Sequence, residues 1–248
     1  MSALRVERDG ALLRVALARP ERRNAFDAAL IAELTTAFAD VGDVRAVVLT
    51  GDGPSFSAGA DVEWMRSSVE LSYEENVVDA LRLRAMLDAI DGCPAPVVAG
   101  VQGHALGGGC GLVACCDVVV AETGTQFAFS EVRLGIVPAV ISPFALAKIG
   151  PGAARRYFVT GERFSVDVAL RIGLVHEVTD DLAAAVDRVL GELLTAGPEA
   201  ARAAKELARA PLSAQETAER IATHRASAEG QEGLRAFLEK RAPGWTGK

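Results

Sequence analysis

Long hydrophobic runs are missing from this sequence. The longest apolar candidate, at residues 136–147, is interrupted by Pro138 and Pro143, whereas a membrane-spanning helix needs about 18 or more consecutive apolar residues. The N-terminus, MSALRVERDG, lacks the apolar core of a secretory signal peptide. We therefore expect a soluble, cytoplasmic protein without a membrane partner.

Metal-binding patterns are missing as well. The three histidines lie far apart in the sequence, and no H-E-x-x-H or Cys/His grouping occurs. The four cysteines have no C-x-x-C spacing and stand among small or apolar residues. These patterns predict no metal site, and they favour reduced, buried cysteines in a reducing compartment.

Positive charge is scarce relative to negative charge. The 26 Lys and Arg residues against 33 Asp and Glu residues give a net charge of −7 at pH 7. Because nucleic-acid binding needs a basic surface, we expect no nucleic-acid partner. A local cluster of Arg and Lys can still bind an anionic small molecule.

Aromatic residues are also few, at 5% of the chain, whereas hydrophobic residues make up 50%. This composition is typical of a globular protein whose core consists mainly of Ala, Val and Leu. The 248 residues suit one domain, with or without a small appendage.

The order of the expected elements indicates an α/β fold. A helix is expected soon after Asn24, which is its expected cap, and a long helix covers residues 70–90. Short apolar strands are expected at residues 12–17, 44–50, 96–101 and 118–121. Later segments have helical periodicity, at residues 153–160, 166–172, 182–194, 199–210 and 213–240. The first two thirds therefore suggest layered β-β-α turns, and the last third is helical.

A glycine-rich loop follows the expected strand at 96–101. Its glycines, at positions 107, 108, 109 and 111, do not match G-x-G-x-x-G, and the helix after them has room for two turns at most. This spacing argues against a nicotinamide-binding unit. Consecutive glycines at a helix start do expose backbone N–H groups, as an oxyanion hole requires. A turn needed only for tight packing is the alternative.

A second small-residue loop, SFSAGAD at residues 55–61, also follows a buried strand and leads into a helix. Two such loops, each with one free N–H group, could hold one carbonyl oxygen between them. Either loop alone is a weak signal.

The two loops in this order resemble those of the enoyl-CoA hydratase/isomerase (crotonase) family. Five stretches carry the resemblance over nearly the whole chain: ARPERRNAF, VVLTGDGPSFSAGADV, GHALGGGCGLVACCDVVVA, FAFSEVRLGIVP and GERFSVDVALRIGLVHEV. The resemblance implies a crotonase-like β-β-α spiral core at residues 1–195. It also implies a C-terminal helical trimerisation region at residues 196–248, and hence a homotrimer or homohexamer.

The resemblance further implies an enzyme that binds an acyl-CoA thioester and stabilises its enolate with two backbone N–H groups. Matched by motif, these belong to Ala60 and Gly108, and the catalytic carboxylate is Glu131. Family members with two glutamates carry the other one where this chain has Gly111. The apolar neighbours of Glu131 are expected to raise its pKa and to suit it to proton transfer. No cofactor is implied, since acyl-CoA is the substrate.

The implied function is that of an acyl-CoA lyase that adds water to an α,β-unsaturated acyl-CoA. Within the family, GLVACCD and FSEVRLGIVPAVISPF look most like the methylglutaconyl-CoA and isohexenylglutaconyl-CoA hydratase-like members. A branched glutaconyl substrate is therefore expected, with its own carboxylate in part of the space left at Gly111. Two alternatives stay open: a Δ3,Δ2-enoyl-CoA isomerase, and a non-catalytic CoA-binding member of the family.

Further residues are assigned to substrate binding by the same motifs. They are Arg23, Ala25, Ala58, Gly59, Asp61, Gly107, Gly111, Pro138, Ala139, Phe237 and Lys240. The backbone of Ala58 is expected near the adenine, and Phe237 and Lys240 are expected to reach the CoA of a neighbouring subunit. Arg22 and Arg241 are further candidates for the CoA phosphates.

Three charged residues in these motifs have a simpler structural explanation. Asp61 suits the cap of the helix that follows it, and Asp117 suits a buried, hydrogen-bonded acid. Arg133 is either a partner of Glu131 or a solvated residue.

Overall fold

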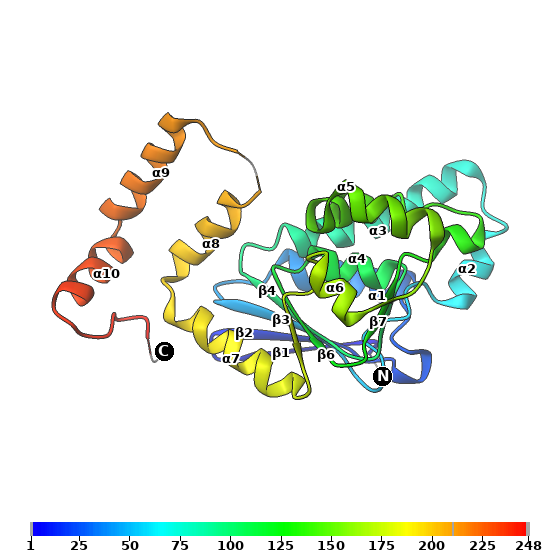
Figure 1. Ribbon diagram of the computed structural model, residues 1–248, viewed down its shortest axis with the longest axis horizontal. Coiled ribbons are helices and arrows are strands. Elements are labelled where there is room, and N and C mark those ends of the chain that lie inside the picture. The colour runs from blue at the N-terminus through cyan, green and yellow to red at the C-terminus, as the bar shows by residue number, and fades with distance from the viewer. Residues whose placement is uncertain (1, 210, 247–248) are drawn as a thin grey trace.

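A sheet of six strands forms the centre of the molecule (Figure 1). The computed structural model describes residues 2–209 and 211–246. The first two strands form an antiparallel hairpin, and all later neighbours in the sheet are parallel. In spatial order the strands are β1 (Leu4–Asp9), β2 (Leu12–Leu17), β3 (Ala46–Gly51), β4 (Val97–Val101), β6 (Val118–Glu122) and β9 (Glu177–Thr179).

A second sheet of three short strands lies beside the first. It consists of β5 (His104–Leu106), β7 (Gln126–Ala128) and β8 (Phe164–Ser165). The chain leaves β4, enters β5 two residues later and then begins α4 (Gly108–Cys115). This strand–strand–helix turn is the β-β-α unit that the sequence predicts, and it brings the glycine-rich loop to the end of β5.

Helices cover both faces of the large sheet because its strands alternate between two cores. Val47 and Val97 belong to the main core, whereas their neighbours Val48 and Val98 pack with α7 (Leu182–Thr195) on the other face. On the main-core side α1 packs on α3, and α4 packs on α5. The elements of that side are η1 (Pro20–Arg22), α1 (Ala28–Ala39), α2 (Val62–Ser68), α3 (Tyr73–Asp91), η2 (Glu131–Leu134), α5 (Ser142–Thr160) and α6 (Val166–Arg171).

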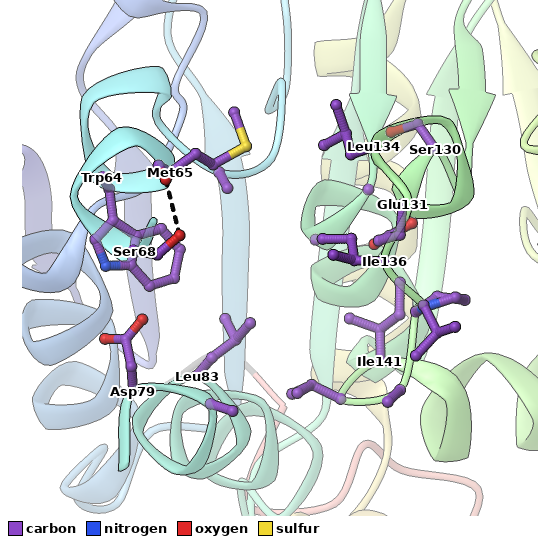
Figure 2. A pocket seen from close by; sticks show the side chains of 18 of the residues that line it. Trp64, Met65, Ser68, Asp79, Leu83, Ser130, Glu131, Leu134, Ile136 and Ile141 are labelled. Atoms are coloured by element: carbon purple, nitrogen blue, oxygen red, sulfur yellow. Dashed lines mark hydrogen bonds between the residues drawn. The ribbon is translucent and has the colours of Figure 1, made fainter. Parts of the chain in front are cut away.

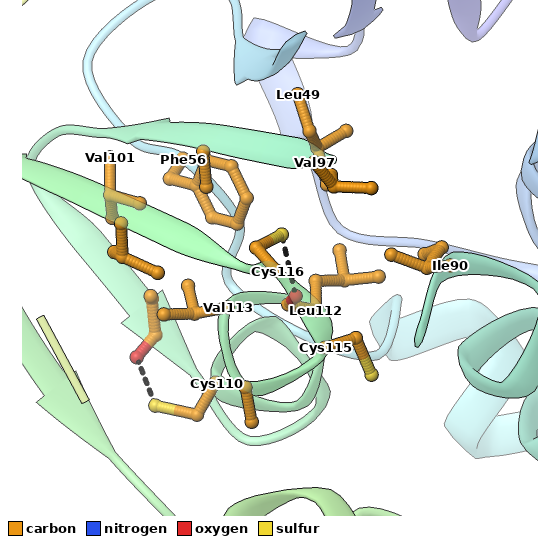
Figure 3. Packing of buried hydrophobic residues seen from close by; sticks show 14 of the residues in the cluster. Leu49, Phe56, Ile90, Val97, Val101, Cys110, Leu112, Val113, Cys115 and Cys116 are labelled. Carbon is orange, nitrogen blue, oxygen red and sulfur yellow. Dashed lines mark hydrogen bonds between the residues drawn. The ribbon is translucent and has the colours of Figure 1, made fainter. Parts of the chain in front are cut away.

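The short helix α4 is buried along its length, and Figure 3 shows its cysteines among the side chains of the core. The Cys110 thiol donates to Ala105 O at 3.0 Å, and the Cys116 thiol donates to Leu112 O at 3.2 Å. Burial raises the pKa of Cys116 to about 12. All four cysteines are free and buried, as the sequence predicts.

The last three helices extend away from the core (Figure 1). They are α8 (Pro198–Leu207), α9 (Ala214–Ala226) and α10 (Ala228–Leu238). Polar contacts connect α8 to the core: Arg202 donates to Val44 O at 3.0 Å, and Lys205 pairs with Asp117 at 2.7 Å. Large apolar side chains stay exposed on this C-terminal arm, at Ile221, Leu234, Phe237 and Leu238.

The predicted division between residues 195 and 196 falls at the end of α7. That it is a domain boundary stays a prediction. The predicted helix at 199–210 ends on residue 210, which lies outside the described part of the chain. Met1 and residues 247–248, which belong to the predicted domains, also lie outside it. None of the helices in the described ranges is long and apolar enough to span a membrane.

Two predictions of helix ends are wrong. The helix expected at 213–240 is divided at Ser227, whose extended backbone ends α9 and whose hydroxyl accepts a hydrogen bond from Gly230 N to cap α10. The cap of α1 is Asp27, which accepts from Leu30 N at 3.0 Å, and Asn24 is instead buried three residues earlier. Apolar spacing alone does not detect a one-residue break or choose between neighbouring cap residues.

Candidate active site

A cavity of about 320 Å³ opens between the α2–α3 helices and the segment that follows β7. Figure 2 shows its two walls, with Trp64, Met65 and Asp79 on one side and Glu131 and Ile141 on the other. Most of the lining is apolar. The residues that line it are Phe26, Ala58, Ala60, Trp64, Met65, Ser68, Asn76, Asp79, Ala80, Leu83, Gly107, Gly108, Ser130, Glu131, Leu134, Ile136, Val137, Pro138, Ala139, Val140 and Ile141.

The two small-residue loops meet at this cavity because their backbones are paired. Ser57 N donates to His104 O, and Leu106 N donates to Ser57 O, both at 3.0 Å. Gly59 follows with φ of +86°, and a Cβ atom there would lie 2.5 Å from Leu106 O. A side chain at this position would therefore separate the loops, and only glycine permits both the dihedral angle and the contact.

Two amide groups at this junction are free to bind a ligand. The neighbours of Ala60 are paired, since Phe26 N donates to Gly59 O and Asp61 N donates to Phe26 O. Among the backbone hydrogen bonds of the described residues, none has Ala60 N or Gly108 N as its donor. Gly108 is also the first residue of α4, where N–H groups have no partner inside the helix. Both residues line the cavity.

Phe26 and Asn24 support this junction, a role that the sequence predicts for neither of them. A Cβ atom on Gly108 would lie 2.3 Å from Phe26 Cζ, so the ring lies directly against the glycine loop. The buried Asn24 amide donates to Asp52 O and Ser55 O, each at 2.8 Å. The N-A-F triplet belongs to one of the stretches that carry the family resemblance, but nothing in its composition indicates these contacts.

Glu131 begins η2 and lies on the wall opposite α2 and α3 (Figure 2). Its Oε2 atom is buried and has no hydrogen-bond partner in the structure. Burial raises the pKa of this carboxyl above its usual value, as the sequence predicts. A carboxylate so placed is a strong proton acceptor that can bind water or substrate within the cavity.

Gly111 does not line the cavity, and the space expected beside it is filled. A Cβ atom on Gly111 would lie 2.6 Å from Ile141 Cγ2 and 3.7 Å from Leu87 Cδ1. Gly111 is therefore not among the residues that line this cavity, and its assignment to substrate binding stays a prediction. Ile141, which the sequence does not predict as a site residue, packs against Gly111 and lines the cavity in its place.

Asp61, the residue after Ala60, has a structural role. Its carboxylate accepts from Glu63 N at 2.9 Å and caps α2, as predicted. It also pairs with Arg19 and Arg22, each at 3.1 Å. Burial opposes its ionisation, but the Glu63 amide and the two guanidinium groups outweigh that effect and hold the pKa of Asp61 below its usual value.

Arg23 is exposed. It lies beside the loop that carries Ala58, because Ala58 N donates to Arg23 O at 2.9 Å. It lies in a basic neighbourhood. Burial lowers the pKa of His104, and the positive charges of Arg163 and Arg23 lower it further. Arg22, in contrast, is paired with Asp61.

The structure brings some of the other candidates to the cavity and leaves others apart. Gly107, Pro138 and Ala139 line it, whereas Ala25 and Gly59 only shape the loops around it. Phe237 and Lys240 lie in the C-terminal arm, at and just beyond the end of α10, and are not part of this cavity.

Three further charged candidates are engaged elsewhere. Arg133 Nε donates to Gly161 O at 2.8 Å, so it is not a partner of Glu131. Asp117 accepts from Val97 N at 2.7 Å, which fits the predicted structural acid, although it is only partly buried. Arg241 pairs with Glu232 at 2.6 Å. Within the described ranges, no group of three or more His, Cys, Asp and Glu residues could hold a metal ion.

The comparison with known proteins agrees with this arrangement. Residues 7–248 match the family model described as enoyl-CoA hydratase/isomerase. The chain belongs to the enoyl-CoA hydratase/isomerase family. It is an enzyme of the crotonase type, with the crotonase fold that the sequence motifs imply.

Relatives from three organisms illustrate how far the similarity extends across this family. The chain is 32% identical to a crotonyl-CoA hydratase of Syntrophomonas wolfei over 258 aligned positions, covering 98% of this chain and 97% of the relative. An enoyl-CoA hydratase structure from Shewanella pealeana is 38% identical with a TM-score of 0.93, covering 98% of this chain and 96% of the other. The structure of Pseudomonas aeruginosa AtuE is 36% identical with a TM-score of 0.93, covering 98% and 99%.

Proposed function

We propose that this protein is an enoyl-CoA hydratase in which Glu131 is the one catalytic carboxylate. The observation that carries the proposal is that Glu131, whose Oε2 atom is buried and unpartnered, lines the same cavity as the free amides of Ala60 and Gly108. Acyl-CoA is the substrate and no cofactor is required. The name of the Syntrophomonas wolfei relative supports the same reaction class.

The proposed reaction uses two backbone donors and one proton carrier. The oxygen of water bonds to Cβ of the enoyl thioester while Glu131 accepts a proton from that water. The π electrons move onto the thioester oxygen, where the Ala60 and Gly108 amides stabilise the enolate. The enolate electrons then form the Cα–H bond with the proton from Glu131, which ends ionised as it began. Because one carboxylate serves both carbons, we expect addition to one face.

The cavity favours an acyl chain without a carboxylate over the glutaconyl type expected from the motifs. A substrate carboxylate needs a cation or free donors, but no Lys, Arg or His of the described residues lines the cavity. Ile141 fills the space next to Gly111 in which that carboxylate was expected. We therefore propose a 2-enoyl-CoA without a carboxylate on its acyl group.

A Δ3,Δ2-enoyl-CoA isomerase is the second candidate. It is favoured by the same single buried carboxylate, because moving a double bond requires one base that takes a proton from one carbon and returns it to another. The acyl product distinguishes the two reactions, since only the hydratase adds the mass of water.

The CoA phosphates are proposed to bind near Arg23, with Arg163 and His104 in the same basic neighbourhood. A homotrimer or homohexamer is proposed for the assembly, because Phe237 and other large apolar side chains of the C-terminal arm are exposed. In such an assembly Phe237 and Lys240 could contact the CoA of a neighbouring subunit.

The test of the proposed function is Glu131→Gln assayed with crotonyl-CoA. We expect kcat to fall by about 10²–10⁴-fold, the usual contribution of a positioned acid or base, with little change in thioester binding. The wild type should lose activity on the acid side, at a pH above the ordinary carboxyl pKa, because burial raises the pKa of Glu131 and the base must be ionised. Glu70→Gln, an exposed carboxylate outside the cavity, is the matched control. Near-wild-type turnover by Glu131→Gln would exclude the proposed role.

A further inference from the structure

A second carboxylate, Asp79, lines the same cavity but lies on the wall opposite Glu131 (Figure 2). It comes from α3, where Asn76, Asp79 and Leu83 follow one another at helical spacing along one face. Farther along that helix, Leu87 and Ile90 are completely buried in the core. Asp79 therefore lies one helical turn before Leu83, on the side of the cavity-lining face away from the buried end of α3.

Asp79 has no partner that would neutralise it. Among the hydrogen bonds and ion pairs of the described residues, none involves its side chain, although it is partly buried. The charged pair on this helix is Arg84 with Asp88, at 2.9 Å. An unpaired carboxylate on this wall disfavours a plain hydrocarbon beside it, because desolvating the charge costs free energy.

The other polar groups on this wall also present oxygen acceptors. The Ser68 hydroxyl donates to Met65 O at 2.8 Å, which leaves its oxygen as an acceptor. The Asn76 amide nitrogen donates to Leu71 O and Ser72 O, at 3.1 and 2.9 Å, which leaves its Oδ1 atom. The indole N–H of Trp64 is one donor against these oxygens and the two of Asp79.

We propose that Asp79 is a specificity determinant which selects acyl chains carrying a hydrogen-bond donor, a hydroxyl or an ammonium group, beyond the reacting double bond. This inference rests on the proposed function, since it places the acyl chain in the cavity that contains Glu131. A donor on the chain satisfies the Asp79 carboxylate, whereas an acidic chain is repelled by it. Asp79 is not assigned a role in proton transfer, because it lies across the cavity from Glu131.

The test compares 2-enoyl-CoA thioesters of equal chain length that end in methyl, hydroxyl, ammonium or carboxylate. Wild type is expected to prefer the hydroxyl or ammonium chain to the methyl chain by about 10- to 100-fold in kcat/KM, the effect of one hydrogen bond to a charged group. Asp79→Asn should remove most of this preference and admit the carboxylate chain. The change should appear in KM, because the contact is made equally in the ground state and the transition state.

Glu74→Gln is the matched control, because this exposed carboxylate is on the same helix but outside the cavity. Dissociation constants of the saturated acyl-CoA analogues, measured by calorimetry on the same variants, test the inference without turnover. The inference fails if Asp79→Asn leaves the kcat/KM ratio of each donor chain to the methyl chain unchanged, or if wild type prefers the methyl chain. Either result leaves the proposed hydratase function intact. If no thioester is hydrated but the analogues discriminate through Asp79, the proposed function fails, and Asp79 determines binding of the acyl chain only.

Discussion

The packing of Gly111 against Ile141 predicts a measurable interaction between two positions. In Gly111→Ala the new Cβ atom would lie 2.6 Å from Ile141 Cγ2 and 3.2 Å from Ile141 Cβ. Overpacking of this kind costs about 1–3 kcal/mol. At roughly 2–4 °C per kcal/mol for a protein of this size, the melting temperature should fall by about 2–12 °C.

Ile141→Ala alone removes the atoms that the new Cβ would meet, but it leaves a cavity that costs about 2–5 kcal/mol. The double variant should lose less than the sum of the two single losses, since each change relieves part of the other. We expect a coupling free energy of about 0.5–3 kcal/mol, measured by urea unfolding of the four proteins in the cycle.

Gly152→Ala is the control for the backbone effect of replacing a glycine. It lies in α5 at an ordinary φ, and a Cβ atom there would have no heavy atom within 4 Å. Additive losses in the cycle, or a Gly111→Ala variant as stable as Gly152→Ala, would refute the steric explanation. If the explanation holds, a glutamate at position 111 requires a smaller residue at position 141.

Two further substitutions test the residues proposed to act on the thioester, Glu131 and Gly108. Burial raises the pKa of Glu131, so the folded protein binds this proton more tightly than the unfolded chain, and stability falls as pH rises from about 4.3 through the raised value. Glu131→Gln should therefore melt higher than wild type at pH 7 and lose this advantage below about pH 4, where the carboxyl group of the wild type is protonated in both states. A difference independent of pH would contradict the reasoning. Gly108→Ala would place its Cβ atom 2.3 Å from Phe26 Cζ and should lower kcat/KM by about 10²–10³-fold through displacement of one oxyanion donor. Steady-state kinetics should recover in part when Phe26→Leu is added, and an unaltered kcat/KM in a folded Gly108→Ala protein would argue that the glycine loop is only a packing turn.

Much of the fold could be predicted from the sequence because its signals are local. Apolar runs bounded by glycine and proline mark the strands, and the predicted strand at 118–121 is found as Val118–Glu122. The wrong predictions concern features decided by single residues. The helix break at Ser227 depends on one residue with extended backbone, and the start of α1 depends on the capping side chain of Asp27 in place of Asn24. Apolar periodicity averages over several turns and does not detect either feature.

The candidate site also contains residues that the sequence predicts and residues that it does not predict. The loops around Ala60 and Gly108 have a distinctive composition, so a motif identifies them. The sequence around Ile141 and Asp79 has no distinctive composition, and only the folded chain brings these residues to the cavity. The filled space beside Gly111 could not be predicted, because the residue that fills it is 30 positions away in the sequence.

The two proposed oxyanion donors are main-chain groups, held at one place by a backbone ladder between Ser57 and β5. Side-chain substitution cannot delete such donors, and most substitutions outside the glycines leave their separation unaltered. The proposed acyl-chain site, by contrast, is lined by side chains of α2 and α3 that take no part in this ladder. Mutation can therefore alter substrate preference on those helices while the reactive geometry persists. Libraries for laboratory evolution of new acyl specificity are best confined to these helices.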